Sequence, residues 1–319
     1  MRILNTLIPI LCIFEIIPLF LILALSLGFA SEDAGRGFSV VTDYLWALSA
    51  EGSMSPQIWH LMALALHLLN GALALVFGRR ELKASWMISL SLSALVLMNP
   101  MGLTAVIFAS RLGSVAVLSC AFIALLLRPH FGLRAASLQG VALLFGLWGF
   151  ALFPVLVFHR YSNIKSLFAP GLVWILGPFF MPPESWHLPN LVNVVVAPAT
   201  GLVPGFGEWS LYLASGFYLV LAVFCRDKLY FRDLGQFFVV YTGLSFLGLP
   251  SDGIYYLALP FLYVMVVRFF SCWEHQPFRS LVLPIFLVVQ CMWANELGLQ
   301  LLEHFAEKAD VLLNSTHAS

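Results

Sequence analysis

Apolar residues fill long stretches of this chain, and short polar segments separate them. A helix of about 20 apolar residues crosses the hydrocarbon core of a bilayer. Because such runs recur along the whole chain, the pattern predicts an all-α polytopic membrane bundle of about nine to eleven transmembrane helices. The expected spans are residues 7–30, 56–77, 85–98, 105–127, 137–158, 167–180, 188–206, 209–224, 234–249, 254–270 and 281–302.

Two parts of this pattern need a separate interpretation. The runs 167–180 and 188–206 are rich in Pro and Gly, so they are either two broken spans or one re-entrant pair. In the first outer loop, residues 38–48 repeat apolar positions with helical spacing, which predicts a short amphipathic helix on the membrane surface. We find no internal repeat, and expect one integral membrane domain over 1–303 and a polar tail over 304–319.

Composition supports the same class of protein. Hydrophobic residues make up 61% of the chain and charged residues 10%, against about 45–50% and about 25% in soluble domains. This excludes a soluble enzyme and a nucleic-acid-binding domain, and makes membrane lipids the expected surroundings. The five cysteines form no CxxC pair, so we expect no zinc or disulfide framework.

The positions of Lys and Arg predict the orientation. Basic clusters follow several spans, among them Arg79-Arg80 and Arg226 with Lys228. Since such clusters stay on the cytoplasmic side, we expect a protein of the bacterial plasma membrane with a cytoplasmic N-terminus. The Asn99-Pro100 turn and the segment 159–165 should then face outward.

Three polar residues of the second span attract attention because polar groups inside a membrane are costly. His60, His67 and Asn70 follow the spacing i, i+7, i+10, which places them on one helix face. They either make interhelical hydrogen bonds that fix packing or bind a substrate. A metal site is disfavoured, because two helical turns separate the histidines by about 10 Å.

Other charged residues leave similar alternatives open. Arg111 at the outer end of a span either reaches the interface or binds a phosphate, and Arg160 either joins it there or only contacts headgroups. Glu32 and Asp33 in the first outer loop suit a general base or a divalent-cation site, and equally a solvated turn. Glu15 lies inside the first span, where we expect a contact within the bundle.

Several of these segments resemble a known family. The stretch 59–70 is similar to the His-rich second span of the transmembrane and tetratricopeptide-repeat O-mannosyltransferases, members of the C-type superfamily of multi-spanning glycosyltransferases. Asn99-Pro100 and Ser110-Arg111 stand at the family's outer turn and at the Arg that opens the fourth span. The segment 254–260 resembles its aromatic-Leu-Pro stretch, and Glu32-Asp33 its acidic motif. The resemblance covers about the first 130 residues and this later segment.

The resemblance implies a function. An enzyme of this kind transfers a sugar from a polyprenyl-phosphate carrier to an acceptor on the outer face of the membrane. Glu32 or Asp33 would be the catalytic base. Arg111, His60 and Arg160 would stabilise the negative charge of the donor phosphate. His67 and Asn70 would contribute to substrate binding.

The chain also departs from the family pattern. Asn99 stands where the family carries His, Thr104 where it carries an acidic residue, and Gly253 where it carries Arg; no tetratricopeptide repeats follow. Two alternatives therefore stay open. One is a catalytically inactive scaffold for a partner membrane subunit, which predicts a closed bundle with satisfied histidines. The other is a lipid or solute transporter, which predicts inverted repeats.

Overall fold

The computed structural model describes most of the helical bundle. The described residues are 2–26, 55–108, 111–127, 131–159, 162–177, parts of 233–249, 251–271 and 281–317. Their regular structure is helical, without a strand among them. The helices are α1 (Arg2–Ser26), α3 (Pro56–Arg80), α4 (Trp86–Leu97), α5 (Pro100–Ile107), α6 (Leu112–Leu126), α7 (Phe131–Leu143), the 3-10 helix η3 (Gly146–Ala151), α8 (Leu152–Val157), α9 (Ile164–Leu176), α13 (Ser251–Ser271) and α14 (Val282–His317).

Four described helices are long and apolar enough to cross a membrane, and they lie in α1, α3, α13 and α14. A fifth span forms if α4 and α5 cross together, bent by 53° at their junction. These lengths and compositions are those of an integral membrane helical bundle. The predicted spans 188–206 and 209–224, and the amphipathic helix over 38–48, lie outside the described residues.

Serine, asparagine and proline residues set where the helices begin. The hydroxyl of Ser55 accepts a hydrogen bond from the Ile58 amide at the start of α3. Asn99 caps α5 by accepting from the Met101 amide at 3.1 Å, with Pro100 as the first helical residue. Pro lacks an amide that the first turn would leave unsatisfied in any case. The sequence Asn-Pro therefore ends α4 and starts α5 in a new direction.

α13 is the most deeply buried of the four candidate spans, and α3 packs closely on α4. The Ser93 hydroxyl on α4 donates to the Gly71 carbonyl on α3 at 2.8 Å, and a Cβ on Gly71 would lie 2.6 Å from Leu97. Small residues thus let α3 and α4 approach closely, as is common between membrane helices. Of the spanning window in α13, 89% is buried.

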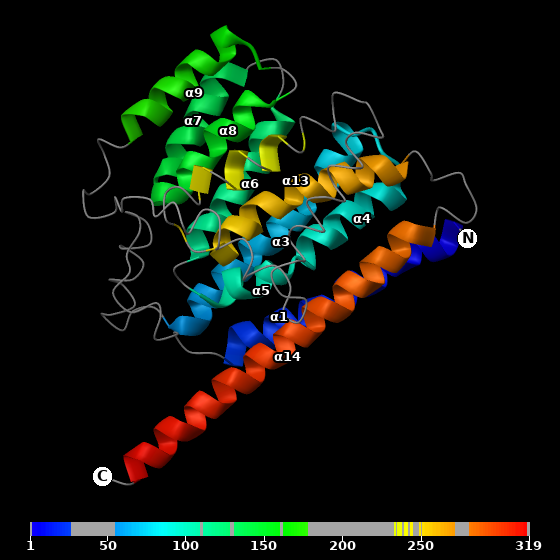
Figure 1. Ribbon diagram of the computed structural model, residues 1–319, viewed down its shortest axis with the longest axis vertical. Helices are drawn as coiled ribbons and strands as arrows, with labels where there is room; N and C mark the ends of the chain where they lie inside the picture. Colours follow the sequence, from blue (N-terminus) through cyan, green and yellow to red (C-terminus); the bar gives the residue numbers. More distant parts are fainter. Residues whose placement is uncertain are drawn as a thin grey trace.

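α1 and α14 run parallel to each other along one side of the bundle (Figure 1). The Cys291 thiol lies 3.9 Å from the Cys12 carbonyl, and the Asn295 amide donates to Glu15 at 2.8 Å. The expected contact of Glu15 within the bundle is therefore confirmed. Both helices also present large apolar side chains outward, for example Phe14 and Met292, as helices facing lipid do.

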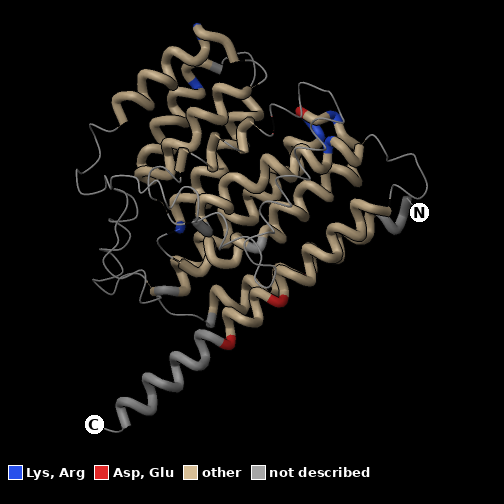
Figure 2. Tube along the Cα trace, in the orientation of Figure 1, with Lys and Arg blue, Asp and Glu red and all other residues tan. Residues whose placement is uncertain are grey.

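The basic end of the bundle is the end that carries Arg79, Arg80, Lys83 and Arg268. α3 and α13 both finish there. Figure 2 shows Lys and Arg near helix ends, whereas carboxylates also lie along the pair formed by α1 and α14. This distribution suits helices whose ends lie at membrane surfaces.

One predicted span is wrong. Residues 137–158 form no single helix: α7 runs along α6 toward Gly113, where Trp148 packs, and η3 and α8 return to Leu125, whose carbonyl accepts from His159 at 3.0 Å. Gly146 makes the turn with a positive φ of 69°. A Cβ on Gly149 would lie 2.3 Å from the Ala142 carbonyl oxygen, so the turn requires glycine.

This hairpin also corrects the expected side of residue 159. Leu125 and Arg111 lie at opposite ends of α6, about 20 Å apart at 1.5 Å per residue. His159 is hydrogen-bonded to Leu125 and therefore lies at the basic end. The expectation that it lies at the outer end with Arg111 is wrong. Arg160 itself lies outside the described residues.

Candidate functional site

Tyr256 on α13 joins His67 and Asn70 on α3. The Nε2 of His67 lies 3.0 Å from the Leu97 carbonyl, and its Nδ1 lies 2.7 Å from the Tyr256 hydroxyl. Because a carbonyl only accepts, Nε2 carries the proton, and Nδ1 of the neutral ring accepts from Tyr256. The three side-chain and backbone groups thus form one directed chain across α3, α4 and α13.

Asn70 extends this chain to α6. Its amide group donates to the Tyr256 hydroxyl and to the Val115 carbonyl, both at 3.0 Å. Its side-chain oxygen accepts from the Ser119 hydroxyl at 2.7 Å. His67, Asn70 and Tyr256 are completely buried, and we call them with Ser119 the polar network.

Two helix interruptions supply backbone partners at this point. Leu97 would bond to the Met101 amide in a continuous helix, but that amide bonds to Asn99, which leaves the Leu97 carbonyl for His67. On α13, Pro260 has no amide to offer the carbonyl of Tyr256 four residues earlier. The Asn99 side chain donates to that carbonyl, over a long 3.5 Å.

His60 lies on the same face of α3 as His67, two turns closer to the start of the helix at Pro56. It is fully buried, and its Nδ1 donates to the Val106 carbonyl on α5 at 3.2 Å. The expectation that His60, His67 and Asn70 share one buried face is confirmed, since Leu61 and Leu68 of the same helix are exposed.

The polar network leaves no room for a ligand beside the His67 ring. A Cβ on Gly102 would lie 2.8 Å from its Cε1 atom, and Phe20 packs on it with ring centroids 4.8 Å apart. No group of three metal-ligating side chains occurs within the described residues. The arrangement is therefore an interhelical cross-link of α3, α4, α6 and α13.

Arg111 precedes the first residue of α6 and is half-buried. Its guanidinium lies over the Phe108 ring, 5.9 Å from the centroid, and its carbonyl accepts from the Ser114 hydroxyl at 2.7 Å. Glu32 and Asp33, the predicted catalytic residues, lie outside the described part of the chain, so their distance to Arg111 stays open.

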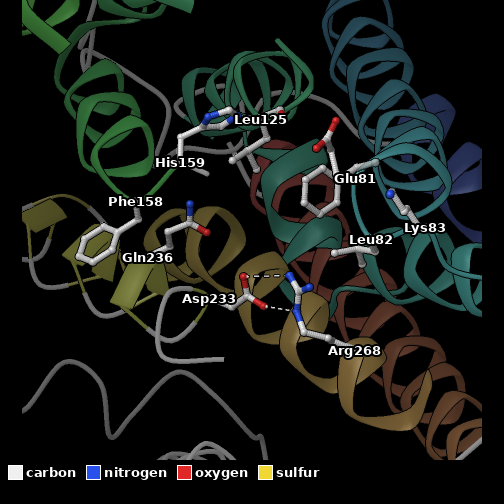
Figure 3. Close-up of a pocket in the computed structure, with 10 residues that line it drawn as sticks. Glu81, Leu82, Lys83, Leu125, Phe158, His159, Asp233, Gln236 and Arg268 are labelled. Atoms are coloured by element: carbon white, nitrogen blue, oxygen red, sulfur yellow. Dashed lines mark hydrogen bonds and ion pairs between the residues drawn. The ribbon is translucent and has the colours of Figure 1, made fainter. Parts of the chain in front are cut away.

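A second site, absent from the sequence predictions, is a pocket at the basic end with a cavity volume of about 350 Å³. Arg268 on α13 forms a bidentate ion pair with Asp233, with Nε–Oδ2 at 3.0 Å and Nη2–Oδ1 at 3.4 Å. Figure 3 shows Asp233 and Arg268 on one side of the pocket, His159 and Gln236 on another, and Glu81 with Lys83 opposite them.

Local structure holds these pocket groups in place. The Arg79 guanidinium donates to the Ala84 carbonyl at 2.5 Å and lies 4.9 Å from the Trp86 ring centroid, which fixes the turn after α3. Within that turn Lys83 has φ 52°, an uncommon conformation outside glycine that often marks functional positions. Gln236 is tied to the Val155 carbonyl at 3.2 Å.

The sequence showed which polar residues lie in apolar runs, but it did not show which residues they bind. Tyr256 was part of the resembling segment, but nothing local links it to α3. Asp233 and Arg268 are opposite charges within or next to two late apolar runs, and that pairing of signs was the available signal for a buried ion pair.

Comparison with known proteins finds no family model, no curated protein and no solved structure that matches this chain.

Proposed function

We propose that this chain is a membrane glycosyltransferase of the polyprenyl-phosphate-dependent class, which transfers a sugar to an acceptor on the outer face. The observation that carries the proposal is a convergence in space. His67 and Asn70, Asn99, and Tyr256 come from three separate segments of the sequence resemblance, up to 189 residues apart, and they bond to one another. The meeting of these three segments supports the proposal, because parts of one site should lie together in the fold.

In this proposal the polar network positions and does not bind the donor. It fixes α3, α6 and α13, and thereby the loops at their outer ends. Glu32 or Asp33 accepts the proton of the acceptor hydroxyl as its oxygen bonds to the sugar C1. The bond from C1 to the phosphate oxygen breaks, and Arg111 stabilises the negative charge that grows on the lipid phosphate.

A second candidate, an inactive scaffold that binds a partner membrane subunit, is favoured by two observations. The polar side chains of the network all bond to other protein groups. In addition, the Trp148 indole fills the space beside Gly253, where the family carries Arg: a Cβ on Gly253 would lie 2.4 Å from this ring.

A transfer assay separates the two. The purified full chain is reconstituted in liposomes with radiolabelled polyprenyl-phosphate sugars and a set of acceptors. We expect turnover by the wild type and a loss of about 100-fold or more in whichever of Glu32→Gln and Asp33→Asn removes the base. Arg111→Gln should also lower the rate, whereas Arg134→Gln, an exposed cation on α7, should not.

The outcomes are distinguishable. Full activity in both carboxylate variants would remove Glu32 and Asp33 from the base role. A wild type inactive with every donor, together with a stable membrane subunit that co-purifies with it, would establish the scaffold in place of the enzyme.

A further inference from the structure

The pocket at the basic end carries both signs of charge in equal number. Glu81 and Asp233 supply two carboxylates, and Lys83 and Arg268 supply two cations. An anion entering this space would approach two carboxylates, and a cation would approach two basic groups. A ligand that bears one positive and one negative group matches such a lining better than either simple ion.

The pocket is also half apolar. Phe77, Leu125 and Phe158 line it together with the charged groups, so it offers an apolar wall next to a polar one. Its volume of about 350 Å³ is at the small end of ligand sites, which span about 300–1,000 Å³. A headgroup with the first part of its lipid fits this combination.

Its position favours a lipid. α3 and α13, two candidate spans, both end at this pocket, so it lies at the level where phospholipid headgroups meet a membrane protein. The outer-face donor site proposed above would be at the opposite ends of α3 and α13, so this pocket is separate from it.

We propose that the pocket binds a phosphoethanolamine group, with the phosphate toward Lys83 and the ammonium toward Glu81. The lipid that carries this group is phosphatidylethanolamine. The ion pair of Asp233 with Arg268, 3.0 Å apart, forms the fixed wall. Lys83, exposed in its turn, is the cation that reaches the phosphate.

The test uses the full-length protein in detergent and measures lipid binding by native mass spectrometry. Phosphatidylethanolamine, phosphatidylcholine and phosphatidylglycerol with identical acyl chains are compared. We expect tightest binding of phosphatidylethanolamine, because its ammonium donates hydrogen bonds that the trimethylated group of phosphatidylcholine lacks. Equal affinity for the three lipids would overturn the proposal.

Two variants assign the ends of the headgroup. Glu81→Gln should bring phosphatidylethanolamine down to the affinity of phosphatidylcholine, a change of about tenfold for one charge-assisted bond. Lys83→Asn should weaken both lipids alike, and Asn tolerates the positive φ at this position. Arg80→Gln is the matched control, because Arg80 is three residues before Lys83 yet does not line the pocket. Variants that behave like this control would also overturn the proposal.

Competition identifies the source of the group. Soluble O-phosphoethanolamine is added to the same protein loaded with phosphatidylethanolamine. If the acyl chains contribute, millimolar competitor leaves the lipid bound, which establishes a lipid site. If the competitor displaces the lipid, the pocket recognises the headgroup alone, and its ligand is then a soluble phosphoethanolamine compound as readily as a lipid.

Discussion

The hydroxyl of Tyr256 lies 2.7 Å from Nδ1 of His67, a residue 189 positions away in sequence, and so joins α13 to α3. It also accepts a hydrogen bond from Asn70. A single oxygen atom thus takes part in two hydrogen bonds between α3 and α13. Its removal is the most direct way to measure what the polar network contributes to stability.

Tyr256→Phe should lower the free energy of unfolding by about 1–2 kcal/mol, because hydrogen bonds between membrane helices are individually modest and two are lost here. Reversible unfolding in mixed micelles measures it. The control is Tyr263→Phe, whose hydroxyl accepts a long 3.5 Å hydrogen bond from Gln290. Equal effects of the two changes would show that the network adds nothing specific.

Two glycines on different helices should respond oppositely to alanine. Gly71→Ala should destabilise the protein by about 1–3 kcal/mol through overpacking, since its Cβ would lie 2.6 Å from Leu97. Gly140→Ala should stabilise α7 by up to about 1 kcal/mol, because nothing lies within 4 Å of its Cβ position. Melting temperatures in one detergent test both. A Gly71→Ala variant as stable as the wild type would contradict the close packing of α3 on α4.

The ion pair of Asp233 and Arg268 should show strong coupling. Asp233 is 4% exposed, so Asp233→Asn leaves a largely buried guanidinium without its counter-charge and should cost about 2–4 kcal/mol, somewhat less than a fully buried pair because Arg268 is partly solvated. Arg134→Gln, at an exposed position, should cost little. A double-mutant cycle with Arg268→Gln measures the coupling, and additive effects would rule out a stabilising pair.

The hairpin of α7 and α8 predicts the side on which residue 165 lies. We expect single cysteines at Lys83 and Lys165, both exposed, to react with an impermeant maleimide from the same side of the membrane. A cysteine at Ser55 should react from the opposite side, because α3 spans about 37 Å between Ser55 and its basic end.

This labelling needs a background in which the five native cysteines are replaced. If the cysteine at position 165 reacts from the same side of the membrane as the cysteine at position 55, the hairpin is excluded. Residues 137–158 would then form a single span.

The parts that sequence could predict are those set by local periodicity. The spacing of His60, His67 and Asn70 was enough to place them on one buried face, because helical geometry alone determines it. Their partner Tyr256 was out of reach, because periodicity does not tell which distant helix a face meets. The hairpin was missed because hydropathy cannot separate one long apolar span from two short helices; the signal lay in Gly146 and Gly149, which the turn requires.

The parallel pairing of α1 with α14 has a consequence for biosynthesis. Cys291 lies against the Cys12 carbonyl across 279 residues, so α1 must wait in the bilayer until α14 has been made. During that interval Glu15 has not yet met Asn295, and a chain stopped before α14 keeps an unpaired carboxyl group in lipid. Such an intermediate is a natural target for membrane quality control, and the synthesis of α14 becomes the event that releases the protein from it.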